Sequence, residues 1–168
     1  MLQVIWVALG IVIFVAAVRS RNSTRAMYVG RAALATLYIG AGALVNAVFL
    51  ATGSDYAEFA ATSYIPFVRD TWRSLVVPNV SIFIPLLIGF ETAVGALVLR
   101  GGRFTQIGLV AAIAFHAALL PFGWGSYMWS IPMIVALALL LRSERRAHTS
   151  GAPVPEEPHG LHRLRTPL

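Results

Sequence analysis

Five long apolar stretches, separated by shorter polar segments, form the hydrophobic pattern of the chain. A helix needs about 20 apolar residues to cross a hydrocarbon core about 30 Å thick. Each stretch has roughly that length and holds at most one charged residue; they are 2–18, 28–52, 78–99, 104–120 and 124–141. The pattern therefore predicts an all-α polytopic membrane protein with five transmembrane helices, a four-helix bundle preceded by an N-terminal helix.

The same pattern divides the chain into three parts. Residues 1–27 hold the N-terminal transmembrane helix and a basic loop, and residues 28–141 hold the four-helix bundle with an outer interfacial segment at 53–77. After Leu141 the composition changes to scattered charges and prolines, which cannot bury enough apolar surface to order themselves. We expect residues 142–168 to form a disordered basic tail on the cytoplasmic side.

Composition supports a membrane protein rather than a soluble domain. Hydrophobic residues make up 58% of the chain, charged residues only 12%, and the mean hydropathy is +0.75. The net charge of +6 would often suggest nucleic acid, but no Arg-rich surface interleaved with aromatic residues accompanies it. We therefore expect lipids and other membrane protein subunits as partners, and no nucleic acid.

The arginines predict the orientation, because cytoplasmic loops of membrane proteins carry an excess of basic residues. With the N-terminus outside, two arginines, Arg69 and Arg73, lie outside. The cytoplasm receives the rest, which are Arg19, Arg21, Arg25, Arg31, Arg100, Arg103, Arg142, Arg145, Arg146, Arg163 and Arg165. Arginine without any lysine is also typical of high-GC bacteria, so we expect a multi-pass protein of the bacterial cytoplasmic (inner) membrane.

The outer segment 53–77 alternates aromatic and polar residues. This pattern predicts one or two short helices in the headgroup layer, broken at Pro66. Trp72 is an interfacial anchor, and Asp70 and Arg73 have the spacing of a local helical ion pair.

Three polar side chains, Asn46, Glu91 and His116, fall inside three different predicted spans. Counting about 1.5 Å per residue from the arginine bordering each helix, Glu91 lies about 13 Å deep, His116 about 20 Å and Asn46 about 22 Å. Glu91 and His116 are thus about one turn apart and could share a proton or a hydrogen bond. A charged Glu facing lipid would cost about 2.5 kcal/mol or more, so we expect it to face the bundle interior.

Small residues accompany these polar groups. Gly108 and Ala112 precede His116 at intervals of four, while Gly42 and Gly95 each lie one turn from Asn46 and Glu91. Such residues let neighbouring backbones approach closely, so we expect them at helix-packing faces. The polar cluster itself has two interpretations that the sequence leaves open, a ligand or proton site and an interhelical polar clamp.

From Arg31 to Leu141 the chain resembles the DoxX-like family of small four-helix membrane proteins. The resemblance rests on Arg31 at the start of a helix, the segment Gly40–Asn46, the segment Gly89–Gly95 around Glu91, and His116 late in the next helix. Family members often carry a basic residue where this chain has Asn46. The resemblance implies an association with membrane redox assemblies, including quinone-linked oxidoreductase subunits and maturation factors.

The sequence favours a non-catalytic role and leaves enzymatic activity open. The chain has no Cys, no evident electron carrier and no metal site, and no nucleophile stands beside the embedded His. The first hypothesis is an accessory subunit of a larger bacterial redox or lipid-transport complex, docking through small-residue helix faces and its Arg-rich cytoplasmic side. The alternative is a quinone- or lipid-binding subunit of a membrane oxidoreductase with a Glu/His pocket, in which a quinone or lipid would be bound.

Overall fold

The computed structural model describes residues 2–150, and in this range the regular elements are all helical. In chain order they are α1 Leu2–Arg19, α2 Thr24–Ala35, η1 Thr36–Leu44, α3 Val45–Ala51, η2 Ala57–Ala60, α4 Pro66–Thr71, η3 Trp72–Val76, η4 Val77–Asn79, α5 Val80–Arg100, α6 Gly102–Leu119, η5 Leu120–Phe122 and α7 Trp124–Ser150. Elements η1 and η3 have the wide turns of a π-helix, and η2, η4 and η5 are short 3₁₀ turns. The prediction of an all-α protein is confirmed.

Four continuous helical stretches are long and apolar enough to cross a membrane. They are Thr24–Ala51, Pro66–Arg100, Gly102–Phe122 and Trp124–Thr149, and α1 adds a shorter apolar helix over Gln3–Arg19. Large apolar side chains are exposed along these helices, as expected for surfaces that meet acyl chains rather than water. The chain is thus a membrane protein with four or five helices able to span.

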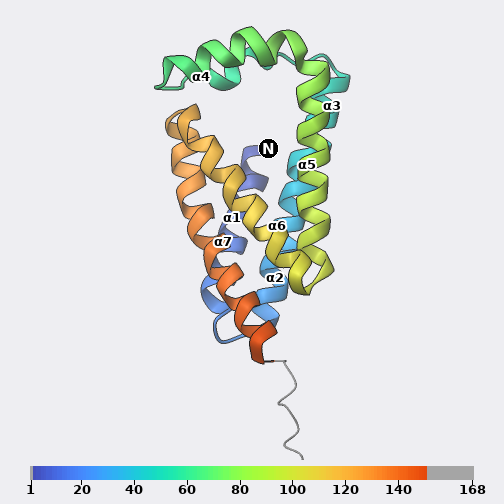
Figure 1. Cartoon of the computed structure of the whole chain (residues 1–168), viewed down its shortest axis with the longest axis vertical. Coiled ribbons are helices and arrows are strands. Elements are labelled where there is room, and N and C mark those ends of the chain that lie inside the picture. The colour runs from blue at the N-terminus through green and yellow to red at the C-terminus, as the bar shows by residue number, and fades with distance from the viewer. Residues whose placement is uncertain (1, 151–168) are drawn as a thin grey trace, which may run out of the picture.

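The helices form one elongated bundle, and α4 lies across one end of it (Figure 1). We call that end the cap end. At the other end α1 finishes, α2 begins, α5 turns into α6 through Gly101 and Gly102, and α7 finishes. We call this the arginine end, because Arg19 and Arg100 close their helices there.

The bundle core is made of aliphatic side chains from all five long helical stretches. Ile13, Leu34, Val98, Leu109 and Leu137 are completely buried. Helix α1 packs against α2 and α7, and α5 packs against both η1 and α6. The N-terminal helix is therefore an integral part of the bundle rather than a separate unit.

Helix α7 is longer than the sequence predicted. It continues to Ser150, so the tail expected at 142–168 begins at least nine residues too early, and residues 151–168 lie outside the described range. Ser143 and Glu144 are buried against the bundle, and the Ser143 hydroxyl lies 2.8 Å from that of Ser20 at the end of α1. These interactions give the polar end of α7 a structural role that its composition does not reveal.

The segment 53–77, which the sequence predicts to lie outside, forms the cap. Its first turn is η2, but Pro66 begins a helix rather than breaking one, since a proline at the first helical position loses no hydrogen bond. From Pro66 the chain stays helical through η3 and η4 into α5. No ion pair joins Asp70 to Arg73 within the described chain; the Asp70 carbonyl instead accepts a hydrogen bond from Ser74.

Hydroxyl and aromatic contacts fasten the cap to the turn between α6 and α7. Ser63 donates a hydrogen bond to the Pro121 carbonyl, and Thr62 donates one to Phe122 at 3.2 Å. The Phe122 ring also meets Phe59 and Trp72, with centroids 5.2 and 5.4 Å away. The longest connection of the bundle is thereby held against its last hairpin.

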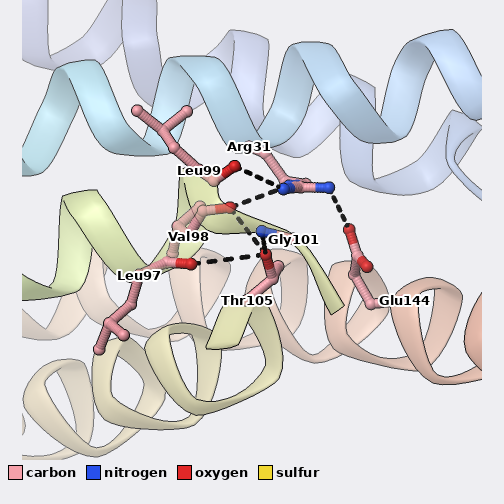
Figure 2. Close-up of polar contacts among 7 residues, drawn as sticks. All are labelled: Arg31, Leu97, Val98, Leu99, Gly101, Thr105 and Glu144. Carbon is pink, nitrogen blue, oxygen red and sulfur yellow. Dashed lines mark hydrogen bonds and ion pairs between the residues drawn. The ribbon is translucent and has the colours of Figure 1, made fainter. Parts of the chain in front are cut away.

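At the arginine end a buried guanidinium joins three helices (Figure 2). Arg31 in α2 donates from Nε to the Val98 carbonyl at 2.9 Å and from an Nη to the Leu99 carbonyl at 3.0 Å, both in the last turn of α5. Its other Nη forms an ion pair with Glu144 of α7 at 3.1 Å. We call this set of contacts the Arg31 clamp.

The Arg31 clamp satisfies groups that a helix cannot satisfy itself. The last carbonyls of a helix have no intrahelical donor, and the negative end of the helix dipole favours a cation there. The Thr105 hydroxyl donates a second bond to Val98, at 2.9 Å, and accepts one from the Gly101 amide at 3.0 Å. The charge of Arg31 is thus balanced by a carboxylate and by a helix C-terminus, which offsets its desolvation.

Replacing Arg31 by Met is expected to destabilise the fold by about 3–5 kcal/mol, because it leaves the Glu144 carboxylate buried without a cation. Unfolding by denaturant in detergent micelles measures this change. Arg103→Met, at an exposed position of the same end, serves as the matched control and should change stability by less than about 0.5 kcal/mol. Equal effects of the two substitutions would contradict a clamp.

Candidate functional site

The Glu91 carboxylate lies inside the bundle, as expected, with 6% of the residue exposed. It accepts a hydrogen bond from the Asn46 amide at 3.0 Å. It also lies directly on the backbone of η1, because a Cβ added to Gly42 would be 2.7 Å from its Oε1. Asn46 therefore binds the carboxylate, and the absence of a side chain at Gly42 leaves room for it.

Asn46 and Glu91 meet although their estimated depths differ by about 9 Å on a straight-helix count. Side chains of a helix lean toward its N-terminus, and these two antiparallel helices therefore point the two side chains at each other. The wide turns of η1 also rise less per residue than an α-helix. The depth of Asn46, measured from Arg31, is therefore smaller than the straight-helix estimate.

The pair is connected to the cap through Tyr56. The Tyr56 hydroxyl donates to the Asn46 carbonyl at 3.2 Å, and the Trp72 indole donates to the Tyr56 carbonyl at 2.8 Å. Partial burial and, secondarily, the negative charge of Glu91 raise the pKa of the Tyr56 phenol above its usual value. The hydrogen bonds of Tyr56 thus join the Asn46–Glu91 pair to the cap.

His116 is buried in α6 with 2% of its surface exposed, and neither ring nitrogen has a hydrogen-bond partner in the described structure. The expected hydrogen bond between Glu91 and His116 is therefore absent from the described residues, because Glu91 bonds Asn46 instead. Two other buried polar atoms of the bundle, the Trp6 indole nitrogen and the Ser130 hydroxyl, are likewise unpartnered.

Tyr38 links the two halves of the site. Its ring meets His116 edge-on at 6.3 Å between centroids, and its hydroxyl is buried and unpartnered. In η1 it precedes Gly42, which lies against the Glu91 carboxylate, by four residues. The candidate site therefore contains a bonded half, Glu91 with Asn46, and an unbonded half, His116 with Tyr38.

An aromatic wall borders the unbonded half. Phe115 lies 6.0 Å from Tyr38, 5.9 Å from His116 and 5.4 Å from Phe90, measured between ring centroids. Phe90 on α5 and Phe115 on α6 are only partly buried, so each is partly exposed at the surface of the bundle. The unbonded half of the site therefore adjoins an apolar aromatic surface.

The predicted small residues contact other helices of the same chain. A Cβ on Gly95 would lie 2.5 Å from the Ile39 side chain, and one on Gly108 would lie 2.9 Å from Val98. Ala112 is completely buried. Because the bundle itself fills these faces, a partner subunit would have to bind elsewhere.

The sequence did not lead us to predict Tyr38 as a site residue. The signal that could have identified it is its hydroxyl group, which lies in an apolar span one turn before Gly42. No group of three or more His, Cys, Asp or Glu side chains that could hold a metal ion occurs between residues 2 and 150. The three predicted interfacial residues, Asp70, Trp72 and Arg73, lie in α4 and η3 of the cap rather than at the site.

Comparisons with protein-family models, with curated proteins and with solved structures find no match to this chain. The resemblance to the DoxX-like family therefore stays a prediction from the quoted residues.

Replacing Gly42 by Ala is expected to push the Glu91 carboxylate off Asn46 and to lower the free energy of unfolding by about 1–3 kcal/mol, through overpacking. Gly40→Ala is the matched control, because a Cβ there meets only a Thr36 methyl at 3.9 Å. It should be neutral or slightly stabilising, since Ala favours a helix over Gly. Denaturation in micelles compares the two variants. Equal stability of Gly42→Ala and Gly40→Ala would show that the Glu91 carboxylate does not depend on the space at Gly42.

Proposed function

We propose that this chain is a quinone- or lipid-binding subunit of a larger assembly in the bacterial cytoplasmic membrane. In this proposal the polar head of a lipid-soluble ligand binds between His116 and Tyr38. The observation that supports it is the buried imidazole whose two nitrogens lack partners beside a tyrosine hydroxyl that also lacks one. The N-terminus faces outward and the arginine end faces the cytoplasm, as the arginine distribution predicts.

The chemistry of the unbonded half favours a ligand with carbonyl oxygens. A neutral imidazole offers one N–H donor and one acceptor, and the phenol offers an O–H donor. Each buried polar group without a partner costs about 1–3 kcal/mol, and hydrocarbon cannot recover this cost. A quinone has carbonyl oxygens to accept these bonds and a flat ring to pack on the wall formed by Phe90 and Phe115.

The position of that wall favours entry from the bilayer. Phe90 and Phe115 are partly exposed on α5 and α6, next to the buried His116. The cap covers the neighbouring end of the bundle and is fastened to the α6–α7 turn. A ligand dissolved in the membrane would therefore reach His116 between the two helices.

A binding role also agrees with the composition of the chain. It has no cysteine, so it cannot carry thiol or Fe–S redox chemistry, and electron transfer would fall to other subunits. The resemblance to the DoxX-like family favours the same setting, because similar proteins are associated with quinone-linked oxidoreductases. The accessory-subunit hypothesis is retained in this form, with docking on exposed apolar faces instead of the glycine faces.

His116→Leu is expected to weaken binding of decylubiquinone by about five-fold or more, because it removes one hydrogen bond worth about 1 kcal/mol. Equilibrium dialysis with the chain in nanodiscs measures the affinity. Tyr38→Phe, which keeps the ring and removes the hydroxyl, should have a similar effect. His148→Leu is the matched control, because His148 is exposed near the end of α7.

Glu91→Gln should leave folding and membrane insertion intact, since an amide can still accept the Asn46 bond. A wild-type chain that does not bind the quinone, or equal losses in His116→Leu and His148→Leu, would refute the proposal. Loss of folding in His116→Leu would move the test to Tyr38→Phe, in which the ring packing is kept.

A further inference from the structure

The second half of α7 has two faces of opposite character. One face is buried and includes Leu137, Leu140, Ser143 and Glu144. The opposite face is exposed and carries Arg142 and Arg145. The single acid in this part of α7 therefore points away from the arginines and is paired with Arg31.

A groove of about 600 Å³ follows the exposed face at the arginine end. Its lining consists of Ala138, Leu141, Arg142, Arg145, Arg146 and Thr149. The lining contains basic, hydroxyl and apolar side chains but no acidic one. The groove is separate from the site around His116 and shares no residue with it.

We propose that this groove binds an anionic glycerophospholipid of the adjacent leaflet. The Arg142 and Arg145 guanidinium groups bind its phosphate, and an acyl chain lies on Ala138 and Leu141. Arginine suits this ligand because its planar group donates two parallel hydrogen bonds to a phosphate. Basic residues next to a membrane span also attract anionic lipids through their charge.

The apolar floor of the groove favours a lipid over a soluble phosphate. Ile131, Val135 and Ala138 are exposed on α7 at helical spacing, and Arg142 continues the same stripe. The stripe thus begins with exposed aliphatic side chains and ends at the arginines. A lipid extends along such a path, with its chain beside the aliphatic residues and its headgroup at the charges.

The bundle fixes which face of α7 is buried and therefore which face carries the arginines. Ser143 is hydrogen-bonded to Ser20, which directly follows α1, and Glu144 is bonded to Arg31 of α2, so this turn of α7 is held on its buried side by two neighbouring segments. The helix that carries the groove is therefore held in place, which reduces the ordering cost of binding.

Native mass spectrometry of the full chain, released from micelles that contain equal phosphatidylglycerol and phosphatidylcholine, tests the proposal. The wild type is expected to retain phosphatidylglycerol preferentially. Arg142→Gln combined with Arg145→Gln should lower this retention about 25-fold, since each arginine contributes about five-fold. Arg21→Gln combined with Arg25→Gln is the matched control, because both residues are exposed at the same end on another segment, and it should retain the preference.

Three further measurements separate the possible occupants. Ala138→Trp fills the apolar floor without changing charge and should also reduce lipid retention, whereas inorganic phosphate should neither bind nor compete. A photo-crosslinking side chain at Leu141 should give adducts with the mass of a lipid.

Several results would overturn the proposal. They are adducts with residues 151–168 or with a second copy of the chain, phosphate binding that is insensitive to Ala138→Trp, and equal losses in the two arginine pairs. If the Arg142/Arg145 variant fails to fold, unchanged retention in Ala138→Trp would overturn it instead.

Discussion

Hydrocarbon cannot donate or accept a hydrogen bond, so each polar group inside this bundle depends on partners that the protein supplies. Arg31 meets this constraint fully, with two carbonyls of α5 and the Glu144 carboxylate around one guanidinium. Glu91 meets it with the Asn46 amide. His116 does not meet it within the described chain, and the proposed ligand site rests on this contrast.

The two ends of the bundle are held by different interactions. Charge and backbone carbonyls hold the arginine end, whereas hydroxyl bonds and packed aromatic rings hold the cap end. The candidate site lies between them, next to η1, whose wide turns bring Gly42 and Tyr38 to the bundle interior. Wide helical turns occur often at functional sites, which agrees with this placement.

Hydropathy was sufficient to predict the helices, because the thickness of a membrane sets their length. The cost of exposing a charged carboxylate to lipid was likewise sufficient to place Glu91 inside. Its partner could not be predicted, since counting residues ignores the lean of the side chains of Asn46 and Glu91. The end of α7 was also missed, because Ser143 and Glu144 look like a polar tail until Ser20 and Arg31 are placed beside them.

The Arg31 clamp joins residues that are far apart in the chain, 67 positions from Arg31 to Val98 and 113 to Glu144. During translation Arg31 is therefore synthesised long before either of its partners. Until α5 and α7 have entered the bilayer, the guanidinium must stay in the hydrated headgroup region. Closure of this end of the bundle is thus a late event of biosynthesis, and it waits for the final helix.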